Sequence, residues 1–280
     1  KKKKKKIIFS AMGWLSIQGR SKLIKLIFTN LFTKRIIKNA DFLVAISPRE
    51  ISDYIENGGK KNKIKLIPNG VSLENFVEND EALFREKFNL DNRKIILFIG
   101  RICEIKGIDI LIESIGRISH KISEYQLCIF GQDDNGFIHK ISNSINRLKL
   151  DNMIHVFPPI LGRDKSLAYS ASDFIVIPSR YDTMTIVALE AGASKCPVIY
   201  SKECDFDDLE LNRAGLKVNP TVESLSEAIL KLANNQYIKD QMSNNIYELV
   251  THSYTWQNVG ETFYDLLVNL DEKIEDIENL

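Results

Sequence analysis

Residues 174–200 read FIVIPSRYDTMTIVALEAGASKCPVIY, and this stretch decides the fold class. The short apolar run at 174–177 predicts a buried strand. Residues 186–193 predict a helix whose small residues let it lie close to a sheet, and 197–200 begin the next strand. A strand, a helix and a second strand in this order predict a βαβ unit in a parallel sheet.

Two carboxylates lie eight residues apart in this unit, Asp182 in the loop after the first strand and Glu190 on the helix. In open parallel sheets, ligands bind at the carboxyl ends of the strands. The helix start at Thr185, Ile186 and Val187 offers unpaired N–H groups that suit a phosphate, whereas carboxylates suit the hydroxyls of ribose or sugar rings. The stretch therefore predicts a ligand site at this edge of the sheet.

The spacing Pro-Ser-x-x-acid-x7-Glu resembles the donor-site signature of retaining GT-B glycosyltransferases of the glycosyl transferases group 1 family (family 4). Two further motifs resemble that family: Gly100-Arg101 followed by Lys106-Gly107, and the Pro-Asn-Gly-Val turn at 68–71. The three motifs keep the family's order over roughly residues 40–260. The resemblance implies an α/β fold of GT-B type, with one complete Rossmann-like carboxyl-terminal domain and a partial amino-terminal Rossmann-like domain.

The resemblance also implies roles for four charged residues. Arg101 and Lys106 would stabilise the leaving diphosphate, a role that suits a planar guanidinium and a mobile ammonium charge. Glu190 would accept hydrogen bonds from the ribose, and Asp182 would contact the transferred sugar. The family needs no metal, and no cofactor is implied beyond the nucleotide-diphosphate sugar substrate. The implied contacts to that substrate are Gly100, Gly131, Pro159, Thr185, Ile186 and Val187.

Each assignment has a structural alternative. Arg101 and Lys106 could be ordinary surface cations, which are common in any soluble protein. Glu190 could lie on a solvated helix face, and Asp182 could cap the helix that follows it. The chain departs from the family as well. Asp182 is one methylene shorter than the family's Glu, and the family usually has Gly at the positions of Thr183 and Thr185, of Asp133 and of Pro158. A side chain in place of Gly restricts how closely a ligand approaches the backbone.

Composition sets the broad class. The 280 residues can bury a sizeable core in one or two domains, and a net charge of +1 gives no general case for binding nucleic acid. The four cysteines contain no Cys-x-x-Cys pair and the four histidines show no metal-ligand spacing, so a reduced, cytoplasmic setting is expected. No run reaches the ~18 apolar residues of a membrane span.

Strand-like and helix-like segments alternate along the chain. We predict a partial amino-terminal, acceptor-side domain over 1–75, a donor-binding domain over 76–255, and a carboxyl-terminal helix over 256–280 that crosses back to the first domain. A complete GT-B enzyme has two domains of similar size, so we expect the acceptor half to be represented by its end alone. The strands predicted in the second domain are 94–99, 125–130, 153–157, 174–177, 197–200 and 216–218.

The amino-terminal region is basic. Lys1 to Lys6 form an unbroken lysine run, and residues 21–39 predict a basic amphipathic helix. One interpretation is a solvated tail followed by a helix that packs on the core; the other is an electrostatic contact with the inner face of a membrane. The protein is therefore expected in the cytoplasm, with peripheral membrane association as the second interpretation.

The sequence thus leaves two functions open. The first is transfer of a sugar, with retention, from a nucleotide-diphosphate sugar to a saccharide or lipid-linked acceptor, in surface polysaccharide or glycolipid synthesis. The alternative is a truncated or degenerate chain that binds a nucleotide or a partner without catalysis. A nicotinamide-dependent dehydrogenase is disfavoured because no Gly-x-Gly-x-x-Gly follows a strand.

Overall fold

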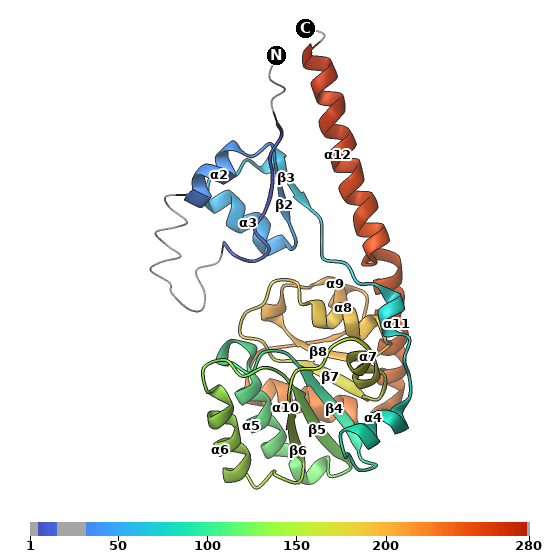
Figure 1. The fold of residues 1–280 in the computed structure, drawn as a ribbon. Helices are drawn as coiled ribbons and strands as arrows, with labels where there is room; N and C mark the ends of the chain where they lie inside the picture. Colours follow the sequence, from blue (N-terminus) through green and yellow to red (C-terminus); the bar gives the residue numbers. More distant parts are fainter. Residues whose placement is uncertain (1–4, 16–31, 279–280) are drawn as a thin grey trace. The chain divides into compact units, whose positions relative to one another are not determined.

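The computed structural model describes residues 5–15 and 32–278, with side chains described as far as residue 268. The chain divides into two compact units (Figure 1). Unit 1 comprises residues 1–70 and 253–280, and unit 2 comprises residues 71–252. Among the described residues, no helix is both long enough and apolar enough to cross a membrane.

Unit 2 is built on a six-stranded sheet in the order β6-β5-β4-β7-β8-β9, and all its strand pairs are parallel. The order reverses between β4 and β7, as in a doubly wound Rossmann sheet. All six strands predicted from the sequence are confirmed to within one residue. They are β4 (Lys94–Ile99), β5 (Tyr125–Phe130), β6 (Ile154–Phe157), β7 (Phe174–Ile177), β8 (Val198–Ser201) and β9 (Leu216–Val218).

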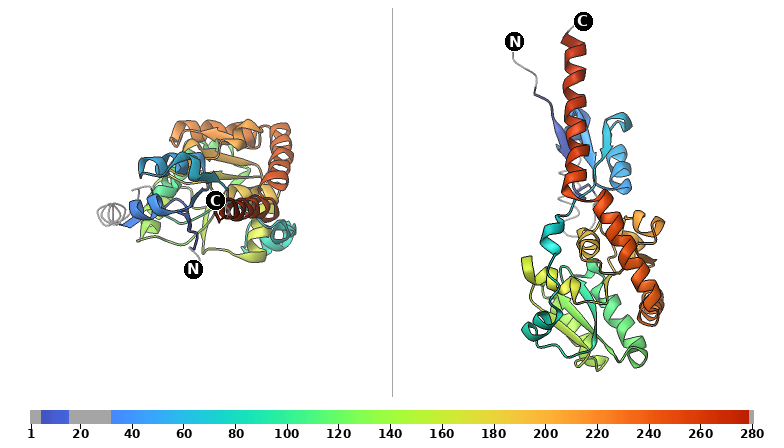
Figure 2. Two further views of the ribbon diagram at one scale, coloured as in Figure 1. Left: turned by 90° about the horizontal axis from the view of Figure 1, so that it is seen from above. Right: turned by 90° about the vertical axis from the view of Figure 1, so that its right-hand side faces the viewer.

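Helices cover both faces of this sheet (Figure 2). On one face, Ile96, Phe98 and the alternate residues of the other strands share a core with α5, α6 and α10. The intervening Ile95 and Leu97 are equally buried, so the second face is also covered. The helices are α4 (Glu81–Lys87), α5 (Ile108–Ile118), α6 (Phe137–Arg147), α7 (Gly162–Ser170), α8 (Ile186–Ala193), α9 (Asp208–Leu211), α10 (Val222–Ala233) and α11 (Gln236–Ser253).

Unit 1 holds a three-stranded parallel sheet in the order β1-β2-β3. Its strands are β1 (Ile8–Ser10), β2 (Phe42–Ala45) and β3 (Ile64–Leu66), and its helices are α2 (Lys34–Asn39), α3 (Pro48–Glu56) and α12 (Trp256–Glu278). Helix α12 packs on this sheet, because Val259 and Leu266 share an apolar cluster with Val44 and Ile67. Of the basic helix predicted over 21–39, residues 21–31 lie outside the described residues.

Helix α3 begins with a side-chain cap. The hydroxyl of Ser47 accepts a hydrogen bond from the backbone N–H of Glu50 at 3.3 Å. The fully buried Glu50 carboxylate in turn accepts from the backbone N–H groups of Ile46 at 2.8 Å and of Gly13 at 2.6 Å. This buried acid therefore ties the turn after β1 to the start of α3, which the sequence did not predict.

Candidate functional site

The residues predicted to contact a ligand follow strand ends at one edge of the sheet, and those after β4 and β7 lie where the strand order reverses. Gly100 and Arg101 directly follow β4, and Asp182 lies in the loop after the neighbouring β7. Gly131 follows β5, and Pro159 lies just beyond the end of the edge strand β6. Parallel strands end at one edge, and the crevice at a reversal point is where such sheets bind ligands. The topology therefore brings the loops that carry these residues to one edge.

Lys106 and Asp182 are in direct contact. The ammonium of Lys106 lies 2.7 Å from a carboxylate oxygen of Asp182. The two side chains are 23% and 18% exposed, so the pair is half-buried and still open to a ligand. The second oxygen of Asp182 accepts from the backbone N–H of Thr183 at 3.0 Å. This bond fixes the carboxylate at the start of the segment 182–185, in which threonines replace the usual glycines of the family.

A close backbone approach joins the loop after β4 to the loop after β7. Gly107 has a φ of +68°, and a Cβ built on it would lie 1.9 Å from the carbonyl oxygen of Pro178. No side chain fits there, so glycine is required. The backbone N–H of Arg180 donates to the carbonyl of Ile105 at 2.8 Å and holds the loops together at a second point.

The Arg180 side chain joins the loop after β7 to the start of α5. Its guanidinium donates to both carboxylate oxygens of Asp109, at 2.7 and 2.9 Å. Burial by itself would raise the pKa of Asp109, but the hydrogen bonds and charge of Arg180, together with Lys140, outweigh it and hold that pKa below its ordinary value. The same pairing raises the pKa of Arg180. This bidentate pair fixes the loop that carries Asp182 against the first turn of α5.

Glu190 lies on α8, and its carboxylate is held by α7. Lys165 Nζ is 2.6 Å from one carboxylate oxygen, and the Tyr169 hydroxyl donates to the other at 2.8 Å. The Glu190 side chain is only 12% exposed, so the solvated helix face considered for it is wrong. Burial, reinforced by the Glu190 charge, raises the pKa of Tyr169 well above its ordinary value, so its hydroxyl stays protonated and donates.

Arg101 is held more loosely. Its side chain is 62% exposed and lies 3.3 Å from the Asp134 carboxylate, a weak surface contact. Gly131 has a packing reason to be glycine, because a Cβ there would lie 2.0 Å from the Gly100 carbonyl oxygen. Asp133 accepts from the backbone N–H groups of Gly136 and Ile138, both at 2.8 Å, and so caps the start of α6.

The start of α8 is formed as predicted. Thr185 is its N-cap, is buried, and makes no side-chain cap hydrogen bond. Ile186 and Val187 form the first turn, and Ile186 is 48% exposed. Met184 precedes them with a φ of +47°, a conformation that glycine adopts without strain. The positive φ lies at Met184, whereas Thr185, where the family usually has glycine, has a φ of −61° that any residue adopts.

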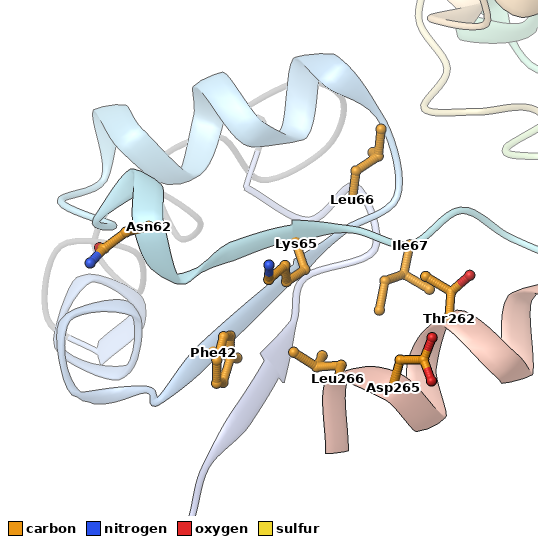
Figure 3. Close-up of a pocket in the computed structure, with 8 residues that line it drawn as sticks. All are labelled: Phe42, Asn62, Lys65, Leu66, Ile67, Thr262, Asp265 and Leu266. Carbon is orange, nitrogen blue, oxygen red and sulfur yellow. The ribbon is translucent and has the colours of Figure 1, made fainter. Parts of the chain in front are cut away.

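One cavity of about 400 Å³ lies in unit 1, and none of the predicted ligand residues lines it. Figure 3 shows it between the strands and α12, with Asp265 and Thr262 on the helix facing Ile67. Its polar and apolar side chains are about evenly represented. The lining residues are Phe42, Asn62, Lys65, Leu66, Ile67, Thr262, Asp265 and Leu266.

The four predicted charged residues therefore form three separate contacts along one edge. Lys106 and Asp182 pair with one another, Arg101 lies against Asp134, and Glu190 is bound by α7. Sequence reasoning missed Asp134 beside Arg101, the Arg180–Asp109 pair that joins the loops, and the partners of Glu190, namely Lys165 and Tyr169. A usable signal existed for the last two, because residues four apart on a helix share one face.

Comparison with known proteins connects this site to a family. Residues 79–249 match the profile of the family described as glycosyl transferases group 1. The mannosylfructose-phosphate synthase of Agrobacterium fabrum is 22% identical over 244 residues, which cover 83% of this chain and 54% of that protein. A D-inositol 3-phosphate glycosyltransferase of Streptosporangium roseum is 25% identical over 174 residues, 59% of this chain and 40% of that protein. The chain spans about half the length of such relatives.

Solved structures share the fold. The Anabaena protein HepE, solved in complex with UDP and glucose, superposes with a TM-score of 0.81 at 18% identity, covering 94% of this chain and 71% of HepE. The sucrose-phosphate synthase of Thermosynechococcus elongatus gives a TM-score of 0.78 at 24% identity, covering 95% of this chain and 67% of the other. Both alignments extend over unit 1 as well as unit 2.

Proposed function

The chain belongs to the glycosyl transferases group 1 family and has the predicted GT-B fold, and we propose on this basis that it transfers a sugar from a nucleotide-diphosphate sugar to an acceptor hydroxyl with retention. The observation that carries the proposal is the set of charged residues on the loops at the reversal point of the sheet, with the Arg101 side chain 62% exposed and that of Lys106 23% exposed. Pairs of cations at such an edge suit a diphosphate.

In the proposed reaction, the bond from the sugar C1 to the diphosphate oxygen breaks while the acceptor oxygen bonds to C1 on the same face. The acceptor proton passes to the leaving diphosphate. Arg101 and Lys106 stabilise the negative charge that grows on the diphosphate, an interaction that is stronger in the transition state than in the ground state. Asp182 orients the sugar, and Glu190 binds the ribose. The start of α8 contributes backbone N–H groups near the phosphates.

Calorimetric titration of the full chain with UDP and GDP tests this proposal. We expect binding of at least one of the two at millimolar ligand or below, and tighter binding of a nucleotide sugar of the same base. Folded protein that gives no heat with either nucleotide would refute the assignment.

The alternative function is a chain that binds a nucleotide without catalysis, and the departures from the family at Asp182, Thr183 and Thr185 favour it. This alternative predicts nucleotide binding with no transfer to saccharide or lipid-linked acceptors.

A peripheral membrane contact is proposed for unit 1. Residues 1–70 carry seventeen Lys and Arg against four Asp and Glu, although the whole chain has a net charge of +1. Since β1, β2 and β3 are parallel, the lysines that precede each strand gather at one edge of the sheet. Each Lys near an anionic surface contributes about 1 kcal/mol to binding. The described lysines of this edge are Lys5, Lys6, Lys38, Lys60, Lys61 and Lys63.

Sedimentation of the full chain with vesicles tests this contact. We expect binding to vesicles that contain phosphatidylglycerol, weaker binding as salt rises, and none to pure phosphatidylcholine. Charge reversal of Lys60 and Lys61 to Glu should weaken the binding, whereas reversal of the exposed Lys231 of unit 2 should not. Equal binding to both vesicle types would contradict an electrostatic contact.

A further inference from the structure

The carboxylate of Glu190 is the best-anchored acid of the site. Lys165 and Tyr169 approach its two oxygens from one face of α7, a single helical turn apart. A carboxylate accepts about four hydrogen bonds, so these two contacts leave acceptor positions on both oxygens. The side chain keeps 12% of its surface exposed, and a ligand at the edge would reach the carboxylate through that surface.

Helix α7 is itself fastened from behind. The Tyr169 ring packs edge-on against Phe76, with ring centroids 5.9 Å apart. The hydroxyl of Ser166, on the same helix, accepts from the backbone N–H of Glu78 at 3.1 Å and lies 3.3 Å from its carbonyl oxygen. The segment from 73 to 78 thus fixes helix α7, which supplies both donors. The Glu190 carboxylate is therefore bound by side chains on a well-packed helix.

We propose that Lys165 and Tyr169 are positioning residues for ribose recognition: they hold the Glu190 carboxylate in place so that its remaining lone pairs accept hydrogen bonds from the two ribose hydroxyls. This inference rests on the proposed function. It differs from a direct phosphate role for Lys165, because the lysine acts through Glu190. Both oxygens are pre-aligned, so the ribose meets a carboxylate that needs no reorganisation.

The test measures the preference for a ribose nucleotide over its 2′-deoxy form. If Lys165 and Tyr169 only stabilised the fold, their substitution would not change this preference. The full chain is titrated with UDP and 2′-deoxy-UDP, and in parallel with GDP and 2′-deoxy-GDP. For the nucleotide that binds, we expect the wild type to favour the ribose form about tenfold, as expected for one lost hydrogen bond to a charged group. Lys165→Met and Tyr169→Phe should each reduce that preference to about two- to threefold, and Lys165→Arg should restore most of it.

Two further variants make the test specific. Glu190→Gln should abolish the preference, and adding Lys165→Met to it should change nothing more, because the lysine acts through this acid. Arg163→Met removes an exposed cation of α7 that lies 3.3 Å from Glu78 and should leave the preference at its wild-type value. Tyr169→Phe keeps the ring that packs on Phe76, so it stays informative even if Lys165→Met does not fold.

The outcomes separate the two proposals. A wild type that binds neither UDP nor GDP refutes the proposed function and this inference together. A wild type that prefers ribose, with the preference unchanged in folded Lys165→Met and Tyr169→Phe, overturns this inference alone. Equal loss of ribose and deoxyribose nucleotides in Lys165→Met also overturns it, since that result assigns the lysine to the phosphates or the base.

Discussion

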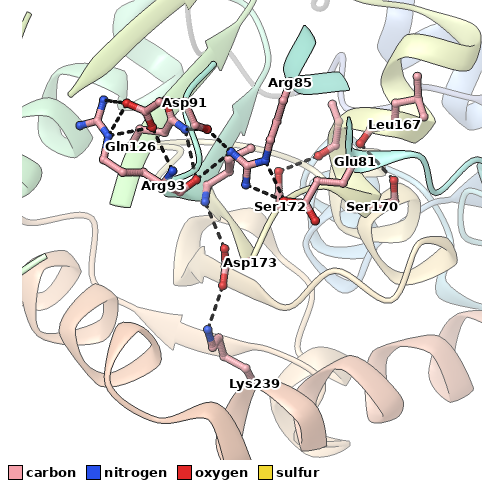
Figure 4. A network of polar contacts seen from close by, with 12 residues as sticks. Glu81, Arg85, Asp91, Arg93, Gln126, Leu167, Ser170, Ser172, Asp173 and Lys239 are labelled. Carbon is pink, nitrogen blue, oxygen red and sulfur yellow. Dashed lines mark hydrogen bonds and ion pairs between the residues drawn. The ribbon is translucent and has the colours of Figure 1, made fainter. Parts of the chain in front are cut away.

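The two edges of the sheet in unit 2 use the same kind of ion pair in different ways. At the amino edge, Lys239 donates to Asp173 at 3.0 Å, and the other oxygen of Asp173 accepts from the backbone N–H of Ile95 at 3.1 Å (Figure 4). At the carboxyl edge, Lys106 lies 2.7 Å from Asp182. The Lys239 side chain is 4% exposed and that of Lys106 is 23% exposed.

The difference lies in what surrounds each pair. At the amino edge, the charges also bind backbone groups: the Arg85 guanidinium donates to the carbonyl of Arg93 at 2.8 Å, and Gln126 lies 3.2 Å from that same carbonyl. At the carboxyl edge, Arg101 projects with 62% of its side chain exposed. Charges at the amino edge therefore stabilise the fold, while those at the carboxyl edge keep surface for a ligand. Four substitutions test this contrast.

The largest effect is expected from Lys239→Met. Removing the buried Lys239 leaves the Asp173 carboxylate, 22% exposed, with the backbone N–H of Ile95 but without its counter-charge, which costs about 3 kcal/mol of unfolding free energy. Urea unfolding followed by circular dichroism measures it, and nucleotide affinity should not change. Lys231→Met, on the exposed side of α10, is the control and should stay within about 0.5 kcal/mol of the wild type. A loss of affinity without a loss of stability in Lys239→Met would reverse the contrast.

Arg101→Ala should show the opposite pattern. A charge-assisted contact to a diphosphate contributes about 1.5–3 kcal/mol, so the affinity for the nucleoside diphosphate should fall about ten- to a hundredfold. The free energy of unfolding should hardly change, because the contact with Asp134 is a weak surface pair. Arg117→Ala on α5 removes an arginine of similar exposure and should leave binding intact. Equal losses of nucleotide affinity in Arg101→Ala and Arg117→Ala would contradict a direct contact between Arg101 and the diphosphate.

Arg180→Met tests the pair that joins the two loops, through its dependence on pH. The folded-state pKa of Asp109 is lowered, so the pair contributes stability above the ordinary carboxyl pKa of 3.8 and loses it as the pH falls through the folded value. We expect a stability difference of about 1–2 kcal/mol at neutral pH, reduced by solvent screening, and a smaller one below pH ~3.8. Thermal unfolding across pH measures it; a gap that widens in acid would contradict the assignment.

The smallest effect is expected from Asp133→Ala. Its carboxylate caps α6, and losing such a cap costs about 1 kcal/mol. Asp133→Asn keeps an acceptor oxygen and should recover most of that loss. Neither substitution should alter nucleotide affinity, although this residue stands where the family often has glycine. A clear change in affinity with unchanged stability would move Asp133 into the ligand site.

Much of unit 2 could be predicted from the sequence because its strands are buried on both faces. Continuous apolar runs such as 95–99 and 174–177 are typical of strands buried on both faces of a parallel sheet. The edge location of Lys106 and Asp182 also followed, since strand ends carry the loops of a parallel sheet. In contrast, β1 is only three residues long and follows a lysine run, so no periodicity marked it.

The partners of the site residues could not be predicted, for a physical reason. Whether Lys165 reaches Glu190 depends on how α7 lies against α8, and that is set by packing rather than by local pattern. The bidentate contact of Arg180 with Asp109 likewise joins residues 71 positions apart. Sequence spacing indicates which residues share a helix face, but not which neighbouring element that face meets.

The loop after β7 is hydrogen-bonded to neighbouring segments through alternate backbone N–H groups. Arg180 donates to the carbonyl of Ile105 at 2.8 Å. Asp182 and Met184 donate to the carbonyls of Glu203 and Cys204 at 3.0 and 3.1 Å. A loop with alternate bonded amides should exchange those three hydrogens with solvent slowly, in contrast to ordinary surface loops. Its shape is then set before any ligand arrives, and little conformational entropy remains to be lost when one binds.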